Sequence, residues 1–311
     1  MIKLNTIFKI LISFTLLWLV LRQIDVNQLV SVIQKANLFW VLLSLFFYLL
    51  IILVGVVRLS IILDPGSKRR PGYLSLLEVY WIGMFFSLVL PGQVTGDVVK
   101  AYKLTNRSGK AVESATAVIM DKMIGITSMV FLASLVLALG FYSLDLSLAG
   151  RSVVILLLAC AIFYFVIFNR GLARRLGFLT QLFKRLKLDR LLRDIYFSFN
   201  IYRHHLDILG KAFLISLITS LMTFIGSYFL GRAVGIDLPL VSFFILIPLI
   251  SVISVLPISI SGVGLQDGAY VYFFTQLGVD PARALGMSLL SHILRFTVSS
   301  FGGIVYLNER K

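Results

Sequence analysis

Long apolar stretches recur along this chain, and they constrain its fold more than any other feature. A helix needs about 20 consecutive, mainly apolar residues to cross a bilayer. Six stretches approach that length, at residues 7–21, 38–62, 114–141, 152–169, 211–231 and 284–307. Because backbone polar groups in lipid must be paired within the segment, these stretches predict helical spans. The expected fold class is therefore an all-α polytopic membrane protein with about six full spans.

The composition excludes a water-soluble domain. Of the 311 residues, 59% are hydrophobic and only 14% are charged, whereas about a quarter are charged in soluble proteins. The net charge of +15 does not indicate a nucleic-acid partner, because too little of the chain can be solvated to present a basic face. It is typical of cytoplasmic loops, which collect Lys and Arg. With a single cysteine, Cys160, no intrachain disulfide and no thiolate metal site can form, and no metal or other cofactor is expected.

Two further apolar regions, 73–99 and 239–277, are interrupted near their middle. Pro91 and Gly92 interrupt the first, and Pro257 interrupts the second. Basic clusters on both sides of the first region place both of its ends in the cytoplasm, whereas the spans on either side of the second region place its ends outside. Each region is therefore predicted to be an interrupted or re-entrant hairpin.

This alternation predicts one membrane domain, 1–311, that contains an inverted-topology repeat. Residues 1–141 form the first half and residues 152–311 form the second, upside down relative to the first. Broken helices at matching positions of two inverted halves are the best sequence pointer to a transporter's central site. The alternative is coincidence, since Pro and Gly are ordinary in membrane helices.

Basic residues also indicate the orientation of the chain. Residues 170–211 carry ten basic residues against three acidic ones. Within the segment 170–210, apolar and basic residues alternate at mostly helical spacing, which predicts an amphipathic helix on the anionic cytoplasmic leaflet. A calmodulin-type partner would suit the same composition. Both termini are expected to be cytoplasmic, in the plasma (inner) membrane of a prokaryote, and the first apolar stretch is expected to be a retained anchor.

Three residues are predicted to begin helices as N-caps. Asp280 precedes Pro281, which suits the first position of a helix, and Asn37 and Ser152 precede or begin apolar spans.

Charged residues inside apolar regions are the candidates for a functional site, because each costs about 2.5 to 3.5 kcal/mol on insertion scales. They are Arg58, Glu78, Asp97, Lys100, Asp121, Lys122, Asp267 and Arg295. Arg58 and Glu78 lie near the ends of their runs, so an interfacial position explains them equally well. Asp97 and Lys100 are three residues apart and share a helix face. Arg295 is predicted near the midplane, one turn after His292, and its structural alternative is an ion pair with Asp267.

The breaks offer a second kind of chemistry. New helices are predicted to begin at Thr95 or Gly96 and at Ser261 or Gly262, with unpaired N–H groups and a positive dipole end. Together with nearby cations these termini predict an anion site, and Gly96, Gly262 and Gly264 would let a headgroup approach the backbone.

The alternative is that Asp97 and Asp267, in the first turns of these helices, satisfy the same donors themselves.

Four motifs follow one another in an order that resembles a known family. They are Pro91-Gly92 with Gly96-Asp97-Val98-Val99-Lys100-Ala101-Tyr102, then Met120-Asp121-Lys122, then Leu256-Pro257 with Ser261 to Asp267, and finally Leu294-Arg295-Phe296. Over almost the whole chain the sequence resembles the flippase-like family related to the membrane domain of lysylphosphatidylglycerol synthases. The resemblance implies movement of a polar-headed lipid between leaflets.

The chain departs from the family pattern at several positions. Lys100 and Lys122 stand where Arg is more usual, and Asp267 stands where Glu is more usual. Charge is kept, but the bidentate reading of phosphate by Arg is lost at the Lys positions. Ser261-Gly262 replaces a usual Gly pair. Since the chain ends at Lys311, soon after the last span, no soluble aminoacyl-transferase domain and no lipid synthesis are expected.

The leading hypothesis is a translocase for an anionic or phosphate-bearing membrane lipid, whose headgroup passes between the two hairpins. No GxxxxGK[ST] motif occurs, so gradients or downstream consumption would supply the energy. One alternative is a membrane-embedded enzyme that uses Asp97, Asp121 or Asp267 as general base on a lipid headgroup. That enzyme would lack any Ser/His/Asp, HExxH or DxD motif. Another alternative is an accessory or assembly subunit whose inner charges only hold helices together.

Overall fold

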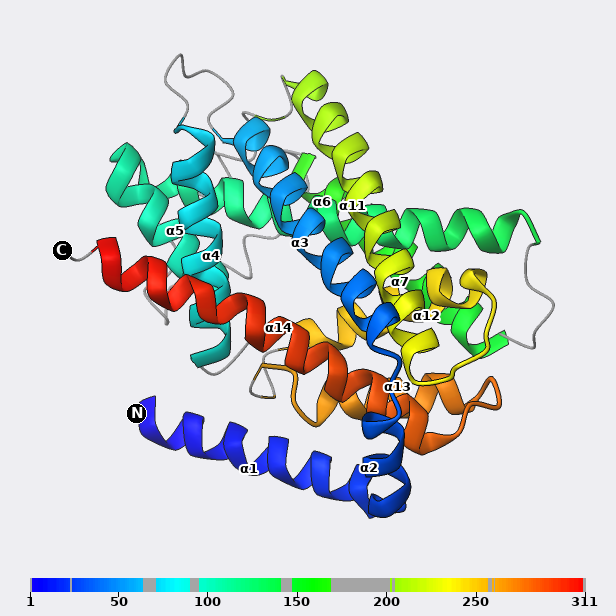
Figure 1. Ribbon diagram of the computed structural model, residues 1–311. Helices are drawn as coiled ribbons and strands as arrows, with labels where there is room; N and C mark the ends of the chain where they lie inside the picture. The colour runs from blue at the N-terminus through cyan, green and yellow to red at the C-terminus, as the bar shows by residue number, and fades with distance from the viewer. Residues whose placement is uncertain are drawn as a thin grey trace.

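A computed structural model describes residues 2–22, 24–63, 71–89, 95–140, 147–168, 202, 205–256, 259 and 261–309. Within these residues all the regular secondary structure is α-helical, which confirms the predicted fold class (Figure 1). The helices are α1 (Ile2–Leu21), α2 (Val26–Gln34), α3 (Leu38–Ile62), α4 (Tyr73–Val89), α5 (Thr95–Ser108), α6 (Ala111–Ala138), α7 (Ser147–Phe168), α11 (Leu206–Ala233), α12 (Leu240–Val255), α13 (Leu265–Thr275) and α14 (Pro281–Glu309).

Among the described residues, four helices are long and apolar enough to cross a bilayer: α3, α6, α11 and α14. A fifth candidate is the pair α1 and α2, which bends by 91° and satisfies the same criteria when taken together. Helices also form over the other two predicted spans: α1 covers 7–21, and α7 covers 152–168 of the predicted 152–169. The chain thus has the helices of a multi-pass membrane protein.

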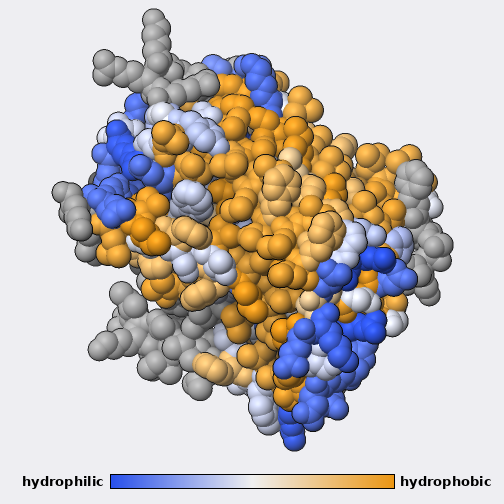
Figure 2. All heavy atoms as spheres, in the orientation of Figure 1, coloured by the Kyte–Doolittle hydropathy of each residue, from blue (hydrophilic) through white to orange (hydrophobic). Residues whose placement is uncertain are grey.

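The surface is suited to a bilayer. Figure 2 shows apolar residues across the middle of one face, with hydrophilic residues gathered at two opposite ends, over α5 and over α2. Large apolar side chains such as Phe39, Phe165 and Phe301 are more than half exposed. Exposure on this scale would be unfavourable in water but is favourable against lipid tails.

Local capping chemistry sets several helix ends. The Asn37 side chain accepts a hydrogen bond from the Phe39 N–H at 3.0 Å, and Asp280 accepts one from the Ala282 N–H at 2.9 Å, so both predicted caps are confirmed. The prediction for Ser152 is wrong. The helix α7 begins earlier, at Ser147, so Ser152 lies inside it.

Both interrupted regions form two helices with a break between them. The helix α5 begins at Thr95 as predicted, but α13 begins only at Leu265, after both predicted positions. The cause is the backbone: φ is 51° at Ser261, 83° at Gly262 and 80° at Gly264, which lies in the left-handed region and cannot belong to a right-handed helix.

Four sets of residues that carry predictions lie outside the described part of the chain. They are Pro91, Gly92, Pro257 and residues 170–201, 203 and 204 of the basic segment 170–210.

Helix α3 packs along α11 in the middle of the molecule. One buried cluster, around Leu59, Leu76 and Met120, joins α3, α4 and α6. Another, around Phe243 and Phe274, joins the helices that follow α7 to Ala133 of α6 and Val153 of α7. The two hairpins pack in a reciprocal manner, with α4 against α14 and α12 against α6. Each hairpin is therefore held by the last helix of the other half of the chain.

Candidate functional site

The break of the second hairpin meets the end of α4. The Ser261 hydroxyl, in the second break, contacts the carbonyl oxygens of Ser87 at 2.8 Å and Leu88 at 3.2 Å, at the end of α4. Carbonyls in the last turn of a helix have no partner within the helix, so this hydroxyl satisfies groups that would otherwise be unpaired in an apolar environment. Arg295 of α14 donates to the Ser261 carbonyl at 2.9 Å. Segments far apart in sequence thus converge at one point.

A cavity of about 340 Å³ lies beside this junction. Its charged lining residues are Arg58, Asp97, Lys100, Asp121, Lys122 and Arg295. The structure therefore brings six of the predicted site residues together, from α3, α5, α6 and α14. Four are cationic and two are carboxylates, so the lining has a formal charge of +2.

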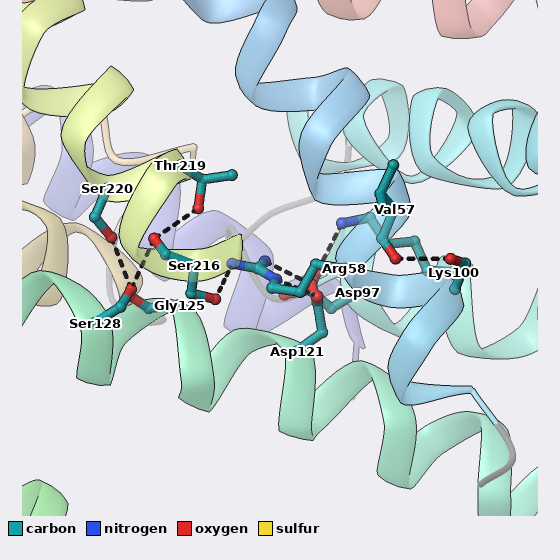
Figure 3. Close-up of polar contacts among 11 residues, drawn as sticks. Val57, Arg58, Asp97, Lys100, Asp121, Gly125, Ser128, Ser216, Thr219 and Ser220 are labelled. Carbon is teal, nitrogen blue, oxygen red and sulfur yellow. Dashed lines mark hydrogen bonds and ion pairs between the residues drawn. The ribbon is translucent and has the colours of Figure 1, made fainter. Parts of the chain in front are cut away.

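Arg58 and Asp121 form a buried, bidentate pair (Figure 3). Arg58 Nε lies 2.6 Å from Asp121 Oδ1, and Arg58 Nη2 lies 3.0 Å from Asp121 Oδ2. A third donor, Nη1, reaches the Ser216 hydroxyl of α11 at 2.9 Å. A Cβ on Gly125 would lie 3.2 Å from Arg58 Nη1, so this glycine leaves the room that the guanidinium occupies on α6. Paired in this way, Arg58 links three helices and has most of its charge satisfied.

Asp97 is shared by two lysines. Its Oδ1 lies 3.2 Å from Lys100 Nζ, which confirms the predicted common face, and its Oδ2 lies 3.2 Å from Lys122 Nζ. Lys100 Nζ also sits 4.0 Å from the centre of the Tyr80 ring, a cation–π contact. The Lys100 stem crosses α4 at Gly83, where a Cβ would lie 2.4 Å from Lys100 Cγ. One carboxylate here faces two cations.

Asp267 and Arg295 are linked through His292. Asp267 accepts hydrogen bonds from the Gly264 N–H at 2.7 Å and from the Ser288 hydroxyl at 2.6 Å. Its Oδ1 also lies 3.0 Å from His292 Nε2, and His292 Nδ1 contacts Arg295 Nη2. The sequence suggested a direct ion pair between Asp267 and Arg295. In the structure the imidazole of His292 lies between them and contacts both.

A smaller cavity of about 190 Å³ adjoins the first and shares Arg295 with it. Tyr48 of α3 lines only the smaller cavity, whereas Gln266 and Tyr270 of α13 line both. Arg295 therefore stands where the two cavities meet, with aromatic and amide groups around it.

The predicted glycines and Asp267 do not line the charged cavity. A Cβ on Gly96 would lie 1.9 Å from Ser87 Oγ and 2.2 Å from the Gly83 oxygen, and a Cβ on Gly264 would lie 2.6 Å from the Ser13 oxygen of α1. The space beside these glycines is thus filled by protein, in contrast to the predicted approach of a headgroup. Gly262 supplies a positive φ in the turn. Asp267 caps the start of α13, the alternative role that its position suggested.

Several residues of the site have no signal in the sequence. Tyr80, Gly83 and Ser216 become partners of Lys100 and Arg58 only when α4 and α11 cross their neighbours. An apolar helix that contains a Gly, Ser or Tyr does not reveal which side chain will lie over it.

An outer ionic cluster ties the end of α14 to the first hairpin. Glu309 lies 2.5 Å from Lys103 and 3.1 Å from Arg107, and Arg107 lies 2.9 Å from Glu78. The end of α14 is therefore beside α5, at the left of Figure 1. Among the described residues, no three His, Cys, Asp or Glu side chains gather closely enough to hold a metal ion.

These features define the class: a multi-pass membrane protein with a charged cavity between two broken helical hairpins. The sequence profile of the family described as "Lysylphosphatidylglycerol synthase TM region" matches residues 6–303, and the chain belongs to that family.

Two archaeal proteins are similar along most of their length. A UPF0104 membrane protein of Pyrococcus horikoshii is 23% identical, with 97% of this chain and 96% of the relative covered. A UPF0104 membrane protein of Methanothermobacter thermautotrophicus is 26% identical, with 89% and 87% covered. No solved structure matches the chain.

Proposed function

We propose that this protein is a lipid translocase that moves an anionic or phosphate-bearing lipid headgroup between leaflets. The observation that carries the proposal is the cavity's formal charge of +2 within an apolar chain. Net charge inside a membrane protein is costly, and it marks substrate or ion pathways. A phosphate group would compensate this charge, while the lipid tails remain in the bilayer.

The size and position of the cavity support the same function. Its volume of about 340 Å³ lies in the range of small-molecule sites. Arg295 lies where the second break meets the end of α4, whereas Lys100 and Lys122 line the cavity from the first half. Lysine is a compact point charge that binds phosphate without fixed geometry, which suits a headgroup in transit better than a rigid clamp does.

We also propose that the two halves form an inverted repeat, with residues 1–141 and 152–311 as the repeated units. The packing of α3, α4, α5 and α6 has a counterpart in that of α11, α12, α13 and α14. In each set the first helix contacts the second, the second contacts the third and the third contacts the last. The reciprocal contacts of α4 with α14 and of α12 with α6 add to this correspondence.

The state of the carboxylates favours transport over catalysis. Asp97 faces two lysines, Asp121 is held by Arg58, and Asp267 has three hydrogen-bonding partners. Each of these carboxylates is already engaged by cations or hydrogen-bond donors, which disfavours the general-base role that the enzyme alternative requires.

For orientation, we propose that the side of α5 is cytoplasmic, in the plasma membrane of a prokaryote, with both termini on that side. The basic residues Lys103 and Arg107 lie there, as the positive-inside rule requires. Tagging each terminus in intact cells and testing its access to protease would check this orientation.

The function is tested in reconstituted vesicles. A fluorescent phosphatidylglycerol is placed in both leaflets, and a membrane-impermeant quencher then reports how much lipid reaches the outer leaflet. We expect the protein to accelerate this exchange. A neutral diacylglycerol-based glycolipid with the same tails is the control for non-specific bilayer disturbance.

The Arg295→Gln variant, reconstituted in equal amount, is expected to lose most of the acceleration. No acceleration for any anionic lipid, or equal acceleration of the neutral lipid, would overturn the proposal.

A further inference from the structure

We propose that His292 links proton binding to anion binding at Arg295, so that the headgroup and a proton bind and move together. This inference rests on the proposed function and adds its energy source. The imidazole is mostly buried, with 16% of its side chain exposed, between the fully buried Asp267 and the cavity-lining Arg295. The charged lining alone does not explain an imidazole at this position.

The partners of His292 define its tautomer. A guanidinium has donors and no acceptor, so His292 Nδ1 must accept the hydrogen bond from Arg295 Nη2. Nδ1 therefore carries no proton. The ring proton is on Nε2, which donates to Asp267 Oδ1 at 3.0 Å. This arrangement requires a neutral imidazole.

Protonation changes this arrangement at one atom. A proton from solution binds Nδ1, which becomes a donor and can no longer accept from Arg295. Two cationic donors then face each other, and the Arg295 guanidinium is driven away from His292. The open direction is the cavity that Arg295 already lines. The hydrogen bond from Nε2 to Asp267 is kept, and it becomes stronger because a positive imidazolium now faces the carboxylate.

The other groups around this pair do not reverse the effect. Within the described part of the chain, the charged residues that contact His292 are Asp267 from α13 and Arg295 from α14 itself. Tyr48 from α3 and Tyr270 from α13 line the cavity beside Arg295 and are neutral between pH 5 and pH 8. Among these groups, histidine alone has an ordinary pKa within that range.

Linkage makes the coupling reciprocal. If a proton on His292 makes Arg295 available to an anion, then a bound anion favours the proton by the same factor. A headgroup would therefore carry a proton with it, and a proton gradient would drive lipid movement without nucleotide.

The experiment measures anion affinity against pH in the detergent-solubilised full chain. The probe is a short-chain phosphatidylglycerol, because a phosphodiester has no proton that titrates between pH 5 and pH 8. We expect the affinity to rise about tenfold from pH 8 to pH 5, within the usual range of coupling between two sites. Addition of the lipid near neutral pH should also take up protons, detected with an indicator dye in weak buffer.

The test variant is His292→Gln, which keeps one acceptor and one donor but does not titrate. It should bind the lipid with an affinity independent of pH and take up no protons. The matched control is His205→Gln, which alters a histidine at the start of α11, outside both cavities, and it should behave as the unmodified protein. Thermal unfolding and gel filtration confirm that each variant is folded.

The possible outcomes separate this inference from the proposed function. Binding that does not depend on pH in the unmodified protein, or the same pH dependence in His292→Gln, overturns the proton linkage and leaves the anion site intact. Absence of lipid binding at every pH overturns the anion site itself.

If His292→Gln fails to fold, His292→Asn is measured in its place, and the proton uptake of the unmodified protein decides the question independently.

Discussion

Removal of Asp121 should destabilise the fold unless Arg58 is removed with it. Asp121→Leu leaves the guanidinium of Arg58 buried without its carboxylate, although Ser216 still accepts one hydrogen bond. Breaking a buried ion pair by deleting one partner costs about 3 to 5 kcal/mol. The lower end applies here, because Arg58 also lines a polar cavity. We therefore expect a loss of about 3 kcal/mol of unfolding free energy.

The double variant Arg58→Met with Asp121→Leu should recover most of this loss, because replacing both ions with apolar groups is often neutral or stabilising. The Ser216 hydroxyl loses its contact with Arg58, which costs about 1 kcal/mol. One cation and one carboxylate disappear together, so the cavity keeps its formal charge of +2. The double variant should therefore still bind an anionic headgroup.

The single cysteine makes the assay simple. Cys160 lies in α7, is only partly exposed and has no second thiol to compete with it, so a thiol-reactive dye reports unfolding during a thermal ramp. A loss of about 3 kcal/mol corresponds to roughly 6 to 12 °C in the apparent midpoint. The control is Lys211→Met, whose exposed partner Asp207 lies 4.0 Å away, and it should shift the midpoint very little. If the double variant unfolds at the same temperature as Asp121→Leu, the unpaired charge of Arg58 is not the cause of the lost stability.

Four further outcomes are expected. Arg295→Gln should fold normally yet bind an anionic lipid at least about tenfold more weakly in titration calorimetry, a loss of about 1.4 kcal/mol; wild-type affinity would refute this. Asp97→Asn should raise the formal charge of the cavity from +2 to +3 and tighten anion binding in the same titration, so weaker binding would count against a cationic site. Gly302→Ala should lower the free energy of unfolding by about 3 kcal/mol, because its Cβ would lie 2.1 Å from a backbone oxygen of α4. Gly210→Ala is the control: no atom lies close to its Cβ, so it should stabilise α11 by up to about 1 kcal/mol. Asn37→Ala should remove the N-cap of α3 and cost about 1 kcal/mol by the same measurement.

The sequence was most informative where a local rule determines the structure. Asn37 and Asp280 act as caps because the chemistry of an N-cap involves only the next few residues. Asp97 and Lys100 share a face because their spacing fixes it. The start of α13 was predicted too early because Ser261 adopts a positive φ, which a non-glycine residue seldom does. Sequence alone does not show that tertiary contacts hold it there.

The sequence did not predict contacts that form where one helix crosses another. The intramembrane charges could be found as exceptions in apolar runs, but their partners could not. Lys100 faces Tyr80 because Gly83 lets its stem pass over α4, and this depends on how α4 and α5 pack. His292 was visible only as a neighbour of Arg295 on one helix. Its role depends on α13, which brings Asp267 to the other ring nitrogen.

The distribution of charge across the two halves bears on how such a protein could move. In the charged cavity, the ion pairs join residues of the same half: Asp97 to the two lysines, and Asp121 to Arg58. The chain from α14 to Asp267 likewise stays within the second half. Between the halves the hydrogen bonds near the cavity use hydroxyls: Ser261 contacts the end of α4, and Ser216 accepts one bond from Arg58. Ionic contacts between halves occur at the end of α14, where Glu309 is partly exposed and water weakens them. For the transport function proposed above, ion pairs kept within each half would let one half rock against the other without breaking a buried ion pair, which is the motion that alternating access requires.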